Sequence, residues 1–262
     1  AVKSTTLDNG MTVLTHAMPH LESAALGIWV KSGSRWETLS EHGISHLLEH
    51  MAFKGTTTRS ARDIAEQIEH VGGELNAATS IEHTGYFARV LKDDVSLATD
   101  ILSDIMRNAV FDATELAREQ RVIIQEIGAA RDDPQDQVFD LFQEALFPDQ
   151  SIGRPILGTV ESVQSFDADQ IRAYMDRNYV GKRMVLAASG HVDHDELVDI
   201  AAERFGDLKS EGDAEPVPAK FVGGDRRQQS DHEQAHIILG MEGRAYNSDG
   251  FYASQILASI LG

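Results

Sequence analysis

The chain has 262 residues, of which 42% are hydrophobic and 25% charged, as is typical of a soluble globular protein with a sizeable core. Lys and Arg number 23 against 42 Asp and Glu, so the formal net charge of -19 argues against nucleic acid or an anionic membrane surface as a partner; it suits basic peptides, although solubility alone also explains it. The absence of cysteine excludes disulfides and thiolate metal sites, and no apolar run approaches the roughly 20 residues of a membrane span.

The first third of the chain alternates strand and helix patterns. Asp8-Asn9-Gly10 is a strong hairpin signal between two short strands. The apolar run 24–30 predicts a strand inside a sheet that is covered on both faces. Ser60 is a suitable helix cap, and Gly72-Gly73 ends that helix. We expect strands at 5–7, 11–16, 24–30, 74–79 and 85–91, and helices at 44–52 and 60–71.

Helical periodicity dominates the middle of the chain. We expect helices at 93–108, 112–130, 135–147, 167–178 and 194–205, with a buried strand at 184–189. The segment 206–231 is rich in Gly, Pro and charged residues and is typical of a linker that holds one strand at most. After it, we expect a strand at 234–241 and a helix at 248–261.

These elements predict an α+β fold, a mixed and mostly antiparallel sheet covered by several α-helices, as the first of two similar halves. We expect a complete domain at 1–210, a linker region at 211–232, and the truncated start of a second, similar domain at 233–262. A run of about 30 residues after a linker is too short to build a core of its own.

The strongest chemical signal is the pentad His46-Leu47-Leu48-Glu49-His50. On a helix, residues four apart lie one turn apart on the same face, so both imidazoles can bind one Zn²⁺. Glu49 leans toward the same face and could take a proton from a water molecule on the metal. The alternative is a pair of surface histidines on an amphipathic helix. The motif H-x-x-E-H is the inverse of the zincin motif H-E-x-x-H and favours a catalytic zinc.

A catalytic zinc needs a third protein ligand, which must be His, Asp or Glu because cysteine is absent. The predicted helix 112–130 offers Glu115, Glu119 and Glu126. Glu119 and Glu126 are seven residues apart, so they share one helix face, but both could also lie on a solvated face. His42 is four residues before His46 and could extend the histidine stripe, although Gly43 favours a helix that begins after it.

The segment 41–56 resembles the active-site helix of the pitrilysin family, which includes insulin-degrading enzyme and mitochondrial processing peptidase. The similarity covers the chain from about residue 4 and is strongest to the catalytic processing-peptidase subunit and its bacterial relatives. The segment 72–80 is similar to the active-site edge strand of that family, and 121–134 to its second ligand helix. By position, the resemblance implies that Glu126 is the third zinc ligand and that Glu119 supports the catalytic site.

The resemblance also implies roles in substrate binding. Phe53 matches an aromatic residue of the pocket for the residue after the scissile bond, although ordinary core packing explains it equally well. Asn76, Ala77 and Ala78 match the strand whose backbone pairs with an extended substrate. Acidic residues that bind arginine near the cleavage site match Asp136 and Asp140, which could otherwise be a solvated helix face.

Together these features predict a zinc-dependent endopeptidase with one Zn²⁺ per active site, in which Glu49 is the general base for attack on a peptide carbonyl. The expected substrates are unfolded, basic or presequence-like peptides. We expect a second half-domain or a partner subunit to close the site, in a homo- or heterodimer, in the bacterial cytoplasm or alternatively the mitochondrial matrix. The alternatives are a non-catalytic core or assembly subunit of the same fold, since some family members have lost the zinc motif, and a metal-binding module without peptidase activity.

Overall fold

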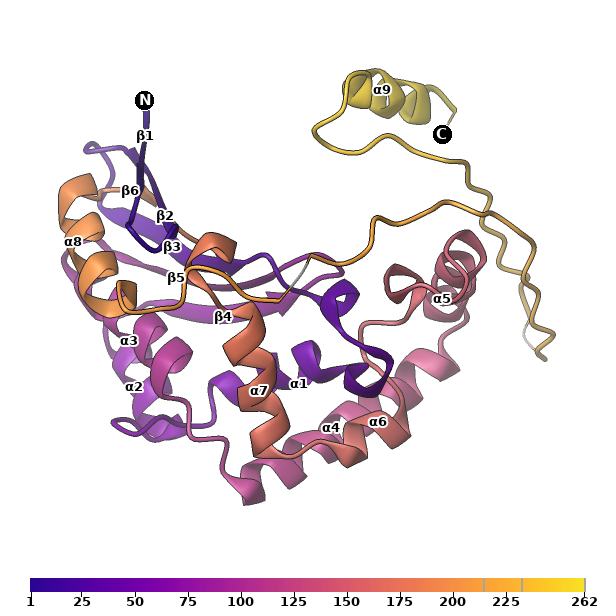
Figure 1. Cartoon of the computed structure of the whole chain (residues 1–262), viewed down its shortest axis with the longest axis horizontal. Coiled ribbons are helices and arrows are strands. Elements are labelled where there is room, and N and C mark those ends of the chain that lie inside the picture. The colour runs from indigo at the N-terminus through magenta and orange to yellow at the C-terminus, as the bar shows by residue number, and fades with distance from the viewer. Residues whose placement is uncertain (214, 232, 262) are drawn as a thin grey trace.

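The computed structural model describes residues 1–213, 215–231 and 233–261 and contains a six-stranded sheet (Figure 1). The strand order is β1-β2-β6-β3-β5-β4, and all neighbours are antiparallel except β2 and β6. The predicted α+β fold with a mixed, mostly antiparallel sheet is therefore confirmed. The strands are β1 (Val2–Thr6), β2 (Thr12–Ala17), β3 (Ser23–Val30), β4 (Glu74–Thr79), β5 (Thr84–Leu91) and β6 (Met184–Gly190).

Each predicted helix is present within a few residues of its expected range, and a short helix at 160–165 was not predicted. Several of the helices begin at a residue that caps them. Ser60, Asp112, Asp133, Asp167 and Asp193 each accept a hydrogen bond from a backbone N–H of the first turn. The helices are α1 (Ile44–Ala52), α2 (Ala61–His70), α3 (Val95–Asn108), α4 (Ala113–Asp132), α5 (Pro134–Leu146), α6 (Val160–Ser165), α7 (Ala168–Asn178), α8 (His194–Phe205) and α9 (Phe251–Leu261). Short 3-10 turns are η1 (Ser34–Trp36), η2 (Leu39–Glu41), η3 (Lys92–Asp94), η4 (Ser151–Gly153) and η5 (Gly181–Arg183).

The sheet packs its core on one face, where α1, α2 and α3 lie (Figure 1). Leu26 and Ile28 of β3 and Tyr86 of β5 point into this core and are at most 1% exposed. On the opposite face, Ala25 is exposed and Trp29 is only partly buried. The prediction that residues 24–30 are covered on both faces is therefore wrong. The physical reason is that a mostly antiparallel sheet needs a helical layer on one face only.

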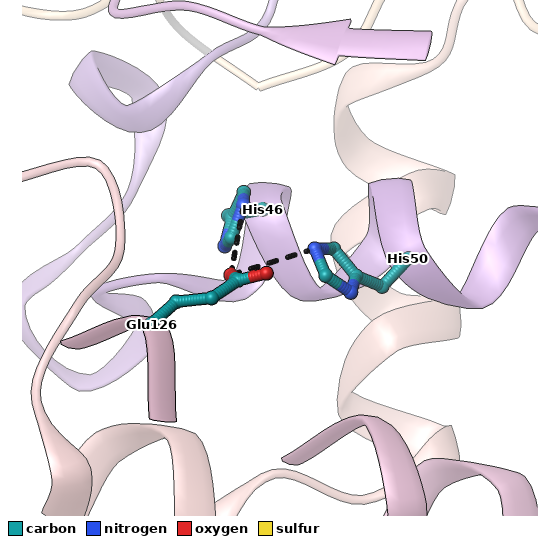
Figure 2. A group of neighbouring side chains, drawn as sticks. All are labelled: His46, His50 and Glu126. Atoms are coloured by element: carbon teal, nitrogen blue, oxygen red, sulfur yellow. Dashed lines mark ion pairs between the residues drawn. The ribbon is translucent and has the colours of Figure 1, made fainter. Parts of the chain in front are cut away.

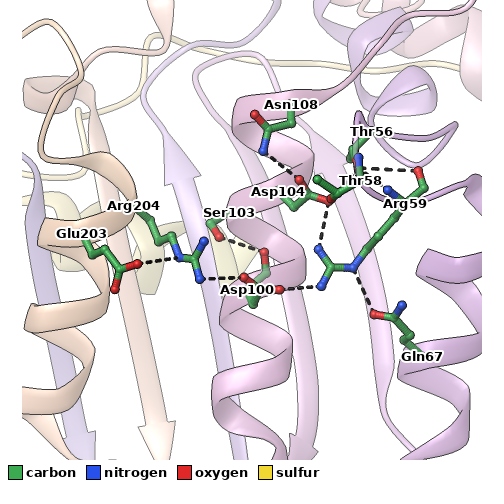
Figure 3. A network of polar contacts seen from close by, with 10 residues as sticks. All are labelled: Thr56, Thr58, Arg59, Gln67, Asp100, Ser103, Asp104, Asn108, Glu203 and Arg204. Carbon is green, nitrogen blue, oxygen red and sulfur yellow. Dashed lines mark hydrogen bonds and ion pairs between the residues drawn. The ribbon is translucent and has the colours of Figure 1, made fainter.

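A polar network fixes the loop that follows α1 (Figure 3). The Asp104 carboxylate on α3 accepts hydrogen bonds from Thr56 Oγ1 at 2.6 Å, from Thr58 Oγ1 at 2.8 Å and from Arg59 at 3.0 Å. Burial alone would raise the pKa of Asp104, but these donors hold it below its ordinary value. The C-terminal end of α1 is thereby anchored to a helix of the core.

The chain after α8 lacks a second domain core among the described residues. The strand predicted at 234–241 is wrong: described residues there have no regular structure, and Ile237, Leu239 and Met241 are 78%, 92% and 78% exposed. A strand needs a hydrogen-bonding neighbour, and none of the six strands offers one to this segment. Residues 214 and 232 of the predicted linker and residue 262 of the predicted second domain lie outside the described residues. Within the described ranges, no helix is both long and apolar enough to cross a membrane.

Candidate metal centre

Two facing helices bring three potential ligands together (Figure 2). His46 and His50 lie one turn apart on α1, with ring centroids separated by 4.7 Å. Glu126 reaches them from α4: its Oε2 lies 3.9 Å from His46 Nε2 and 3.7 Å from His50 Nε2. One ligand atom from each of the three residues lies within 4.8 Å of the others. The convergence arises because α1 and α4 pack through buried aliphatic side chains such as Leu47 and Ile123.

The donor set fits a zinc ion. Bonds of 2.0–2.1 Å in a tetrahedron place neighbouring ligand atoms about 3.3 Å apart, so the distance from Glu126 Oε2 to each histidine nitrogen needs to shorten by roughly half an ångström. Burial, with a smaller effect of neighbouring His50, lowers the pKa of His46 to about 4. The His46 imidazole is therefore neutral near pH 7, which is the form that binds metal.

Glu119 orients the second histidine. Its Oε2 lies 3.0 Å from His50 Nδ1, and its Oε1 lies 2.7 Å from Lys54 Nζ. Only 7% of Glu119 is exposed. Burial would raise the pKa of Glu119, but the hydrogen bonds from Lys54 and His50 lower it below its ordinary value. A carboxylate on the far nitrogen is the usual support of a metal-binding histidine, since it directs the other nitrogen toward the metal.

Glu49 and His42 take different positions. Glu49 is half-buried on α1 between the two histidines and does not belong to the group of three potential ligands. His42 precedes the helix and is separated from it by Gly43, whose φ of 97° breaks the helical stripe. The His42 Nε2 atom lies 2.7 Å from the carbonyl oxygen of Pro155. This contact holds His42 apart from the pair on α1.

The segment predicted to bind substrate forms the edge strand next to this group. Strand β4 is the last strand in the sheet order, and among the described residues it pairs only with β5. Thr79 Oγ1 donates to the Ser45 carbonyl at 3.4 Å, which holds the strand against α1. Asn76 and Ala78 are exposed, whereas Ala77 is 8% exposed. The Asn76 Oδ1 atom accepts a hydrogen bond of 2.8 Å from the Ala77 N–H.

Comparison with protein families identifies the family of the chain. The sequence model described as insulinase (peptidase family M16) matches residues 12–160, more than half of the chain. The chain belongs to this family. The model described as the peptidase M16 inactive domain matches residues 165–262. Strand β6 comes from this second region, yet it lies between β2 and β3 in the middle of the sheet.

Relatives in the M16 family carry zinc protease in their names. The chain is 43% identical over 257 residues to an uncharacterised zinc protease of Rickettsia felis, and the match covers 98% of this chain and 62% of the relative. It is 40% identical over 268 residues to one of Mycobacterium tuberculosis, covering 100% of this chain and 61% of the relative. A Bacillus subtilis zinc protease is 38% identical over 262 residues, with 100% and 64% coverage. The chain thus spans less than two thirds of the length of these relatives.

Solved structures of the family share the fold. A protease from Helicobacter pylori superposes with a TM-score of 0.75 at 23% identity, covering 83% of this chain and 52% of that one. The periplasmic protease PqqL from Escherichia coli gives a TM-score of 0.74 at 24% identity, with 84% and 25% coverage. A peptidase M16 inactive domain from Pseudomonas fluorescens gives a TM-score of 0.78 at 18% identity, and the match covers 84% of this chain and 54% of that one. At these identities the likeness establishes the fold alone.

Two further residues implied by the family resemblance, Phe53 and Asp140, line separate cavities, whereas Asp136 lines neither of the two. Phe53 is partly buried against the core and also lines a cavity of about 1000 Å³ that reaches Asn76. Asp140 lines a different cavity, of about 860 Å³, between α5 and the turn η4. Burial and the charge of neighbouring Asp136 raise the pKa of Asp140. The two aspartates are therefore close to each other but do not belong to the three-ligand group.

Sequence reasoning missed two residues next to the centre. Lys54 lies four residues after His50, and that helical spacing could have indicated its contact with Glu119. Glu37 accepts hydrogen bonds from the start of α1, but no spacing rule predicts a contact across the intervening turn η2.

Proposed function

We propose that the protein is a zinc-dependent endopeptidase whose single Zn²⁺ is held by His46, His50 and Glu126. The observation that carries the proposal is the convergence of these three donors, with Glu49 between the histidines on the same helix. Because the chain spans about three fifths of the length of its relatives, the peptidase activity is proposed for a protein of their full length.

The residues of this chain have distinct roles in the proposed reaction. Zinc, when bound, supplies a Lewis acid that polarises a peptide carbonyl and acidifies water. Glu49 accepts a proton from the attacking water and passes it to the leaving amine. Glu119 keeps the His50 ring in the orientation that its role as a ligand requires.

The proposed substrate is an extended, unfolded peptide. The outer edge of β4 at Asn76–Ala78 can pair with such a chain, because this strand has a sheet neighbour on one side only. Phe53 would line the pocket for the residue after the scissile bond, and Asp136 with Asp140 would bind a basic, presequence-like part of the peptide. We further propose that a second half-domain or a partner subunit closes the site, and that the protein acts in the bacterial cytoplasm.

A substitution of Glu49 tests the proposal, because it separates metal binding from catalysis. In the full-length protein, Glu49→Gln should retain zinc and lose peptide hydrolysis by several orders of magnitude, since the base is removed while its size is kept. Zinc content by metal analysis and cleavage of an unstructured basic peptide provide the two readouts. If the wild-type protein binds zinc but cleaves no such peptide, the site belongs to a non-catalytic assembly subunit instead.

A further inference from the structure

A buried carboxylate lies at the start of the helix that carries both histidines. Glu37 lies between the turns η1 and η2 and is 3% exposed. Its Oε2 accepts a hydrogen bond of 2.8 Å from the Gly43 N–H, and its Oε1 accepts one of 2.9 Å from the Ser45 N–H. The Ser45 hydroxyl donates to the same Oε1 atom. One side chain thus satisfies three donors at the N-terminus of α1.

The start of α1 cannot be capped by its own first residue. The N-cap position is Gly43, which has no side chain and adopts a left-handed conformation with φ of 97°. A side chain would not fit there, since a Cβ atom would lie 2.8 Å from the Leu157 carbonyl oxygen. The N–H groups of the first turn therefore depend on a carboxylate from outside the helix, and Glu37 supplies it.

The contacts of Glu37 lie directly before the first ligand. Ser45 immediately precedes His46, and its carbonyl also accepts the hydrogen bond from Thr79 on the edge strand β4. A displacement of Ser45 therefore moves His46 relative to Glu126, which is held on the separate helix α4. A negative charge at a helix N-terminus also interacts favourably with the helix dipole, which adds to the attraction between the Glu37 carboxylate and the start of α1.

We propose that Glu37 is a positioning residue that holds the start of α1, and with it His46, in the arrangement that binds zinc. This inference rests on the proposed zinc site. It goes beyond that site because Glu37 contacts none of the three ligands and belongs to neither of the helices that carry them.

The charge of Glu37 changes near neutral pH, because its pKa is raised to about 7. Burial raises its pKa from 4.5 to about 7, against the hydrogen bonds from Ser45 and Gly43 and the nearby Arg154. The other ionisable groups around it are Glu41, close to Arg154, and His42 and Tyr174. Burial lowers the pKa of His42 and raises that of Tyr174, so both are neutral near pH 7. Glu37 is therefore ionised above about pH 7 and protonated below it.

Zinc affinity measured at two pH values tests the proposal. Wild type and Glu37→Gln are titrated with Zn²⁺ against a competing chelator at pH 8.5 and pH 6.0. At pH 8.5 the substitution should weaken binding by about 10- to 100-fold, the usual loss when a support of a metal site is removed. At pH 6.0 the two affinities should agree within about threefold, because Glu37 of the wild type is then mostly protonated and therefore neutral, as the glutamine of the variant is at every pH. Proton competition at the ligands is common to both proteins and cancels in the ratio.

Controls separate positioning from general stability. Asp193→Asn makes the same carboxylate-to-amide change at the exposed cap of α8, which carries no candidate ligand, and should leave zinc affinity unchanged. If Glu37→Gln fails to fold by circular dichroism, Ser45→Ala replaces it and should weaken zinc binding by about 3- to 10-fold at pH 8.5.

The possible results lead to different conclusions. Equal affinities of wild type and variant at pH 8.5 would overturn the positioning role, and a ratio that does not change with pH would reduce Glu37 to a structural cap. Failure of the wild-type protein to bind zinc at all would instead reject the proposed function.

Discussion

Glu119 offers a sharp test of how the centre is supported, because its two oxygens have separate partners. One accepts from His50 Nδ1 at 3.0 Å and the other pairs with Lys54 Nζ at 2.7 Å. In Glu119→Gln, one oxygen becomes an NH₂ group, so either His50 or Lys54 faces a donor instead of an acceptor. In the first case His50 loses the oxygen that accepts its hydrogen bond, and in the second case residue 119 loses the ion pair with Lys54 that holds it beside His50.

The expected loss of zinc affinity is 10- to 100-fold, or about 1.4–2.8 kcal/mol. Chelator competition at pH 7.5 measures it. The matched control is Glu115→Gln, one helical turn earlier, where the carboxylate pairs only with Arg118 on the surface. An affinity of Glu119→Gln equal to that of Glu115→Gln would refute the supporting role. Loss of all zinc, as after removal of a ligand, would mean that Glu119 itself binds the metal.

Two further predictions concern specificity and stability. Replacing Asp136 and Asp140 by Asn in the full-length protein should lower kcat/KM for a peptide with Arg near the scissile bond, by a factor equivalent to about 1–3 kcal/mol of lost transition-state stabilisation. A matched Ala peptide should be little affected, and equal losses for both peptides would reduce the pair to a solvated helix face. For the metal-free chain, the folded state binds a proton at Glu37 more tightly than the unfolded state does, so the unfolding free energy of wild type relative to Glu37→Gln should fall by about 3 kcal/mol as pH rises from 4.5 to 7. Urea titrations across that range check the second prediction, and a difference that does not vary with pH would contradict it.

The spacing of apolar residues along the chain predicted most of the helices and strands, because it indicates which residues are buried on one face of an element. The helix at 44–52 matches α1 residue for residue, since its apolar positions recur at helical spacing and Gly43 ends the preceding segment. The strand predicted at 234–241 failed because strand propensity does not provide a hydrogen-bonding neighbour. The prediction that residues 24–30 are covered on both faces was wrong because a short apolar run does not distinguish a strand buried on one face from a strand buried on both.

Some residues of the candidate site could be predicted from the sequence and others could not. The pair His46 and His50 follows from spacing on one helix, whereas Glu126 could be chosen among three glutamates only through resemblance to a family. The contacts of Lys54 and Glu37 depend on how α1 packs against α4 and against the turns before it. Such contacts join separate elements, so no periodicity within one element predicts them.

The central claim is that His46, His50 and Glu126 form one zinc site, and metal analysis of the purified chain tests it most directly. After Zn²⁺ supplementation and dialysis, we expect one zinc per chain in the wild type and at most trace zinc in His50→Ala, because two remaining ligands rarely retain the ion. Trace zinc in the supplemented wild-type protein, or equal zinc in both proteins, would contradict the account.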